Sequence, residues 1–176
     1  MSRIHTMVLC VVCVSMSGLR LSAQTPVSNA LRLSTANFSR NLVEAAEEMP
    51  AEKYGFKPTP AQMSFADVVV HLAEGNDMMC GWISGTTAPA APKVTATDAK
   101  DKLVARLRQS FDYCTSAFAK MGDTGLADSI PFFGRKMARA DEMFAIAIDW
   151  ADHYSQQAIY LRLNGLLPPT AKRKQG

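Results

Sequence analysis

The chain has 176 residues, of which 48% are hydrophobic and 20% are charged, and its formal net charge is +3 at pH 7. This length suits one domain built around a single hydrophobic core. The nearly balanced charge excludes a strongly basic nucleic-acid surface, so we expect no nucleic-acid partner.

The first 23 residues have the pattern of a secretory signal peptide. Basic residues precede an apolar stretch at residues 7–19, and small residues follow before a cleavage point near Gln24. The apolar stretch is too short to be a good membrane span. We therefore expect a periplasmic or secreted protein, with no membrane association after cleavage, whose domain comprises residues 24–176. An uncleaved anchor is the alternative.

Four segments of the chain show the hydrophobic period of amphipathic helices. They span residues 28–49, 64–85, 98–122 and 139–164. Ser64 and Asp67 form a short version of the capping box at the start of the second helix, and Gly165 ends the fourth. Strand alternation is not recognisable anywhere, so the sequence predicts an all-α fold.

Two long connections constrain how these helices are arranged. Residues 86–97 contain two prolines, and twelve extended residues reach up to about 40 Å, the length of a long helix. This reach permits the second and third helices to run parallel. The partly apolar residues 123–138 are expected to pack over one end of the bundle, and the basic residues 172–174 are expected to form a solvated tail.

Two cysteines, Cys80 and Cys114, remain after the leader is removed. In an oxidising compartment two thiols can form one disulfide. Both also occupy positions where a helix buries a small apolar residue, which a free cysteine does well. Both interpretations stay open at this point.

The run around residue 150 contains the strongest chemical signal in the chain. Asp149 and His153 are one helical turn apart, so their side chains project from one face about 6 Å apart along the axis. His71, the only other histidine outside the leader, has an inward position in the second helix. A buried polar group without a partner costs roughly 1–3 kcal/mol, a cost that a shared cation would offset. A hydrogen-bonded core histidine and a surface charge pair are the simpler alternatives.

Two stretches of the chain resemble the DinB/YfiT-like superfamily. The C-terminal stretch has His-Tyr-Ser-Gln at 153–156, Tyr-Leu-Arg at 160–162 and Gly-Leu-Leu-Pro-Pro at 165–169. Residues 49–58 and 63–73 resemble the segment that leads into the family's first metal-binding histidine. The resemblance covers nearly the whole chain after the leader, and it implies a four-helix bundle of up-down-down-up order.

The same resemblance implies a ligand set for a divalent ion. His71 falls on the first ligand position, His153 on the last, and Asp149 on the middle position, where many members have histidine. Two imidazoles and one carboxylate suit zinc, nickel, iron or manganese with an open coordination position. Gln156 is a candidate to orient a ligand or a bound water, and Glu74 to accept a proton or fix an imidazole. Each of these two also fits an ordinary polar residue on a helix.

The implied function is that of a metal-dependent hydrolase or a thiol transferase acting on an unidentified small-molecule substrate. Homodimerisation is a further expectation from the resemblance. The aspartate at position 149 keeps an alternative open, in which the bundle is a non-enzymatic metal-binding or interaction module with a degraded site.

Overall fold

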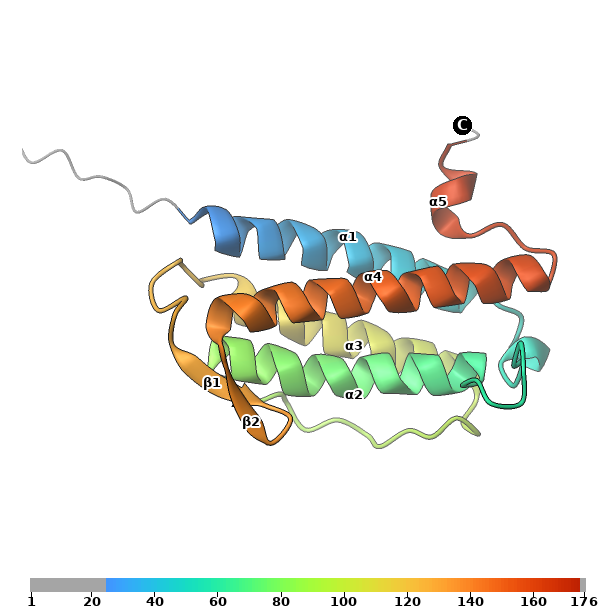
Figure 1. Ribbon diagram of the computed structural model, residues 1–176. Helices are drawn as coiled ribbons and strands as arrows, with labels where there is room; N and C mark the ends of the chain where they lie inside the picture. Colours follow the sequence, from blue (N-terminus) through green and yellow to red (C-terminus); the bar gives the residue numbers. More distant parts are fainter. Residues whose placement is uncertain (1–24, 175–176) are drawn as a thin grey trace, which may run out of the picture.

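The computed structural model describes residues 25–174 as a bundle of four long helices (Figure 1). These helices are α1 (Pro26–Glu48), α2 (Phe65–Ser84), α3 (Lys100–Phe118) and α4 (Arg139–Leu163). The smaller elements are η1 (Ala51–Lys53), β1 (Ser129–Phe132), β2 (Arg135–Ala138) and α5 (Pro169–Lys172). The predicted helical bundle is confirmed, while the predicted signal peptide at residues 1–23 lies outside the described residues. No helix between residues 25 and 174 is both long enough and apolar enough to cross a membrane.

Local sequence sets the ends of α2. The Ser64 hydroxyl accepts the backbone N–H of Asp67 at 3.1 Å, and the Asp67 carboxylate accepts the backbone N–H of Ser64 at 2.9 Å. This reciprocal pair is the predicted capping box, and it satisfies two N–H groups that the helix itself leaves unpaired. At the other end, Gly85 adopts the left-handed conformation with φ 72°, which glycine tolerates at no steric cost.

The four helices follow the up-down-down-up order that was predicted. Figure 1 shows α1 and α4 running in one direction and α2 and α3 in the other. The connection between α2 and α3, residues 85–99, runs back along the length of the bundle, a distance that an extended segment of this length can span. The parallel helices α2 and α3 pack against each other, and α4 packs against both α1 and α2. The interface between α2 and α4 is where the candidate ligands lie.

The prediction of no strands is wrong for residues 129–138, which form an antiparallel hairpin. The strands are only four residues long, and one contains Pro131, so their alternation is too short to recognise in sequence. Phe133 and Gly134 form the turn with φ of 43° and 79°, the pair of positive values that a tight hairpin requires. The Phe133 ring packs edge-on against Trp82, with ring centroids 5.3 Å apart. The hairpin therefore covers one end of the bundle, as expected of this segment.

A buried polar cluster joins three helices inside the core. The Trp150 indole N–H donates to Asn76 Oδ1 at 2.7 Å, and the Asn76 amide donates to the Ser110 hydroxyl at 2.9 Å. Trp150 and Ser110 are fully buried, and Asn76 is 2% exposed. Because a buried polar group is costly unless paired, these bonds favour one relative placement of α2, α3 and α4.

Cys80 and Cys114 form a disulfide between α2 and α3. Both residues are also fully buried in the core. The alternative of two free buried thiols is therefore excluded, and the two parallel helices are covalently joined near their C-terminal ends. A bond of this kind is typical of proteins in oxidising compartments.

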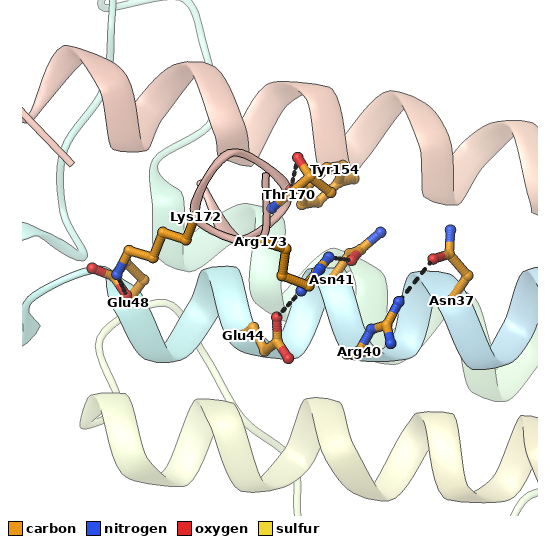
Figure 2. Close-up of polar contacts among 9 residues, drawn as sticks. All are labelled: Asn37, Arg40, Asn41, Glu44, Glu48, Tyr154, Thr170, Lys172 and Arg173. Atoms are coloured by element: carbon orange, nitrogen blue, oxygen red, sulfur yellow. Dashed lines mark hydrogen bonds and ion pairs between the residues drawn. The ribbon is translucent and has the colours of Figure 1, made fainter. Parts of the chain in front are cut away.

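The basic residues 172–174 are exposed, as predicted, and two of them also form ion pairs with the bundle. Figure 2 shows Arg173 paired with Glu44 and Asn41 of α1, and Lys172 paired with Glu48. The Tyr154 hydroxyl donates to the Thr170 hydroxyl at 2.8 Å. The sequence pattern missed the contacts of Lys172 and Arg173 because their partners lie more than a hundred residues away on α1.

Candidate metal centre

Three of the predicted site residues meet between α2 and α4. His71 comes from α2, and Asp149 and His153 come from successive turns of α4. One ligand atom from each of the three lies within 4.8 Å of the other two. Two atoms bound to one zinc-sized ion are at most about 4.2 Å apart, so small side-chain rotations bring all three into range. The predicted convergence is confirmed, and this group could hold a metal ion.

The two histidines approach each other edge to face. Their ring centroids are 4.9 Å apart and their planes are inclined by 67°. The Nε2 atom of His153 lies 3.5 Å from Oδ1 of Asp149. The donors are therefore two aromatic nitrogens and one carboxylate oxygen around a common point, a set suited to a divalent transition metal.

The three ligands differ in exposure, and one prediction about them is wrong. The sequence period placed His71 on the inward face of α2, whereas its side chain is exposed. The side chain of Asp149 is 37% exposed and that of His153 only 11%. His71 lies at the edge of the interface between α2 and α4, where its side chain can approach α4 and remain exposed to solvent. The site is consequently open on the His71 side and closed on the His153 side.

A chain of hydrogen bonds orients the imidazole of His153 through its Nδ1 atom. The Tyr160 hydroxyl donates to the backbone carbonyl of Met63 at 2.9 Å, so its oxygen is left to accept the Gln156 amide N–H at 3.1 Å. The amide oxygen of Gln156 therefore faces Nδ1 of His153, at 3.0 Å. An accepting oxygen at that position requires a hydrogen on Nδ1, which leaves Nε2 free to bind a cation.

Electrostatics around His153 favour a positive charge at this point. Burial by itself lowers the pKa of the imidazole, but hydrogen bonds to Asp149 and Gln156 and the nearby carboxylates outweigh it. The net result is that the pKa of His153 is raised above its usual value. A site that stabilises a proton between Asp149 and His153 also stabilises a metal cation there.

The two residues predicted to support the chemistry have different positions. Gln156 contacts His153 directly, through the bond described above. Glu74 is exposed on α2, one turn beyond His71, and lies on the rim of a separate hollow that also involves Asp77 and Trp82. In the described part of the chain, no hydrogen bond or ion pair joins Glu74 to the three ligands.

Sequence reasoning missed two groups that hold the site in place. One is the Met63 carbonyl with the Tyr160 hydroxyl, which completes the chain behind His153. The other is the bond from Trp150 to Asn76, which links the residue after Asp149 to the helix that carries His71. The one sequence feature that could have indicated the second group is Asn76, a polar residue in the middle of the apolar face of α2.

The family model described as the DinB superfamily matches residues 36–156, a span that contains all three ligands. A comparison with curated protein sequences found no match.

Two solved structures are similar in fold. A DinB-like protein from Bacillus subtilis aligns with a TM-score of 0.64 at 19% identity, covering 78% of this chain and 92% of that one. A DinB-like protein from Bacillus cereus aligns with a TM-score of 0.66 at 15% identity, covering 84% of this chain and 97% of that one. Because the family model spans well over half of the sequence, this chain belongs to the DinB superfamily.

Proposed function

We propose that the protein is a metal-dependent enzyme in which His71, Asp149 and His153 hold one divalent cation. The observation that carries this proposal is the approach of three ligand atoms to within 4.8 Å of one another. Three protein ligands leave coordination positions open, which is the pattern of catalytic rather than structural sites. The exposed side of the centre, at His71, is where water or a small substrate enters.

The donor set narrows the identity of the ion. Two imidazoles suit zinc, nickel and iron, while the carboxylate at position 149 shifts the preference towards harder ions such as iron and manganese. The hydrogen bond that Nδ1 of His153 donates to the amide oxygen of Gln156 holds this imidazole in the tautomer that metal binding needs. We infer that Gln156 is a positioning residue for this ligand.

The reaction that we propose is attack by an activated nucleophile on a small electrophilic substrate. A bound divalent cation lowers the pKa of the water or thiol that it holds, which supplies a nucleophile near neutral pH. Asp149 would balance the charge of the cation. The proposed proton acceptor is Glu74, which is exposed on α2 one turn beyond His71. Hydrolysis and thiol transfer are the two reactions that fit this arrangement.

We also propose that the protein is exported to the periplasm or secreted. The buried disulfide between Cys80 and Cys114 supports an oxidising compartment, and the leader pattern of residues 1–23 agrees with it. Export favours hydrolysis over thiol transfer, because low-molecular-weight thiols are kept reduced mainly in the cytosol. Fractionation of cells expressing the full chain tests this point, and retention in the cytosol with an intact leader would contradict it.

Metal analysis of protein purified without chelator tests the ligand assignment. We expect about one equivalent of a divalent ion in the wild type, and loss of most of it in the His71→Ala and Asp149→Ala variants. The Asp141→Ala variant is the matched control, because Asp141 is an exposed carboxylate on the same helix that lies outside the group. A wild type that stays metal-free after dialysis against each candidate ion would contradict the proposal.

A second candidate function rests on Asp149 itself. Where the family resemblance leads one to expect a third histidine, this chain has a carboxylate, and a weakened centre would suit a non-enzymatic metal-binding or interaction module. Activity screening on small esters and other electrophiles, with and without an added thiol, separates the two. Turnover that is lost in both His71→Ala and Asp149→Ala supports the enzyme, whereas stoichiometric metal without turnover supports the module.

A further inference from the structure

The turn of the β1–β2 hairpin brings three aromatic rings and two cations together. Phe133 packs edge-on against Trp82, with ring centroids 5.3 Å apart, and against Phe132 at 4.9 Å. The Arg135 guanidinium lies over the Phe132 ring, 5.0 Å from its centroid, and Lys136 beside it is exposed. We call these five residues, Trp82, Phe132, Phe133, Arg135 and Lys136, the hairpin tip.

Phe133 has two properties that are unfavourable for the protein alone. It is 59% exposed, so most of its ring surface faces water. Its backbone has φ 43°, and it is the one non-glycine residue between residues 25 and 174 with a positive value, a conformation that bulky residues rarely adopt. An asparagine before Gly134 would form the same turn without either cost. A strained and exposed aromatic residue indicates that the ring itself has a function.

The charge at the hairpin tip is positive. The hairpin contains Arg135 and Lys136, both exposed, and no acidic residue. The carboxylate of Asp128, which precedes the first strand, is already paired within the protein, and Glu74 lies about 12 Å along α2 from the tip. Cations beside exposed aromatic rings match an anionic lipid surface, in which the rings enter the interfacial layer and the cations contact phosphate groups.

The hairpin lies at the end of the bundle where α1 begins, as Figure 1 shows. Just before the hairpin, the Asp123 carboxylate accepts the backbone N–H groups of Val27 and Ser28, at 3.0 Å and 2.8 Å. Two residues, 24 and 25, separate α1 from the leader pattern and span at most about 7 Å. A leader inserted in a bilayer therefore holds this end of the bundle close to lipid, so the export that we propose brings the tip to a membrane surface.

We propose that the hairpin tip binds the surface of an anionic phospholipid bilayer, weakly and reversibly. The five residues of the tip are far fewer than the roughly 20–30 residues that each partner contributes to a standard protein interface, which favours lipid over a protein partner. We expected no membrane association after leader cleavage because the hairpin is not recognisable in the sequence, and the tip changes that expectation. The proposal goes beyond the metal-dependent activity and does not depend on it.

Co-sedimentation with lipid vesicles measures the binding, with the leader removed so that it does not contribute. Residues 24–176 include every element of the described bundle and its whole core, so this form retains the fold. We expect binding to vesicles that contain phosphatidylglycerol, weakened by added salt, and much weaker binding to vesicles of phosphatidylcholine alone. Equal binding to the two kinds of vesicle, or binding to neither, would overturn the proposal.

The Phe133→Asn variant distinguishes a ring that binds lipid from a ring that only packs on Trp82. Asn-Gly is a favoured pair for this turn, so we expect the unfolding temperature to stay the same or rise. The affinity for anionic vesicles should fall about 10-fold. Ile159→Asn is the matched control, because Ile159 is an apolar residue, 53% exposed, near the other end of α4. Equal vesicle affinities in the two variants, or a loss of binding that accompanies a loss of stability, would assign Phe133 to the fold alone and overturn the proposal.

The double variant Arg135→Gln/Lys136→Gln tests the electrostatic part of the binding. Each basic residue near an anionic surface strengthens binding about 5-fold, so the double variant should bind anionic vesicles about 30-fold more weakly and depend less on salt. The control is Lys53→Gln/Lys57→Gln, which removes two exposed charges between α1 and α2, at the opposite end of the bundle. Equal losses in the two double variants would show attraction by net charge alone and overturn the role of the tip.

Discussion

The amide oxygen of Gln156 lies 3.0 Å from Nδ1 of His153, and this contact decides which imidazole nitrogen is free to bind a cation. The Tyr160 hydroxyl accepts the other end of the Gln156 amide, so the orientation of the amide is set by a third residue. Nδ1 is therefore occupied as a donor, and Nε2 is directed towards Asp149. The metal centre that we propose depends on this arrangement as much as on its three ligands.

Replacing Gln156 with alanine is expected to weaken metal binding without unfolding the protein. Loss of the bond that orients His153 should lower the affinity for a divalent cation by about 10-fold to 100-fold. Competition against a chelating dye measures this affinity. The control is Gln109→Ala, which removes an exposed glutamine on α3, a helix that contributes no group to the site. Equal affinities in the two variants would contradict the role assigned to Gln156.

Removing the Asn76 side chain is expected to destabilise the core by disrupting the α2 and α4 contact. In Asn76→Ala the buried Trp150 N–H and Ser110 hydroxyl lose a partner, which should cost about 1–3 kcal/mol of unfolding free energy. Denaturant titration measures this change. The double variant with Trp150→Phe should lose less than the sum of the two single variants, and strict additivity would show that the bond contributes nothing.

Breaking the Cys80 and Cys114 disulfide is expected to lower stability while the helices remain. The bond closes a loop with a sequence separation of 34 residues, and its loss should cost about 2–4 kcal/mol, chiefly because the unfolded chain gains freedom. Thermal and denaturant unfolding of the Cys80→Ala/Cys114→Ala variant measure the cost. Thiol titration of the unfolded wild type, without reductant, should find neither of these two cysteines free.

The buried Glu142 is expected to make stability depend on pH. Within residues 25–174, neither of its carboxylate oxygens has a hydrogen-bond partner. Burial raises the pKa of Glu142 to about 7 against the opposing effect of Arg139. Below pH 4.5 Glu142 is protonated in both the folded and the unfolded chain, so it does not lower the free energy of unfolding. As the pH rises from 4.5 towards 7, Glu142 ionises in the unfolded chain before it ionises in the folded chain, so the free energy of unfolding decreases.

The Glu142→Gln variant removes that ionisation and provides the measurement. We expect it to be about 1–3 kcal/mol more stable than the wild type at pH 8, and equally stable near pH 4.5. Urea titrations at the two pH values give both numbers. A variant that is less stable than the wild type at pH 8 would mean that the buried carboxylate is stabilised by a charge.

Much of the bundle could be predicted because helix formation is governed by near neighbours. The period of apolar residues predicted four helices, and the pair Ser64 and Asp67 predicted where α2 begins. The length of the connection between α2 and α3 allowed the parallel pair that the structure contains. The spacing of Asp149 and His153 placed both on one helix face, the helical pattern made His71 the third candidate, and the resemblance assigned all three to one site.

Other features depended on contacts between residues far apart in the chain. The four-residue strands of the hairpin are stable only against α2 and α4, and the exposure of His71 depends on how closely α4 approaches α2. Pairing of Cys80 with Cys114 required the two helices to be adjacent at those positions. The hydrogen-bond chain that orients His153 ends at the backbone carbonyl of Met63, and no pattern of residues in the sequence identifies such an atom.

The sequence by itself determined the helices, their caps and the residue types available to bind a cation, because propensity, capping and spacing act over a few residues. The tertiary structure alone decided which of those residues meet, how open the centre is to solvent, and which nitrogen of His153 is free. These properties depend on the packing of α2 against α4, which is set by buried contacts summed over the whole core.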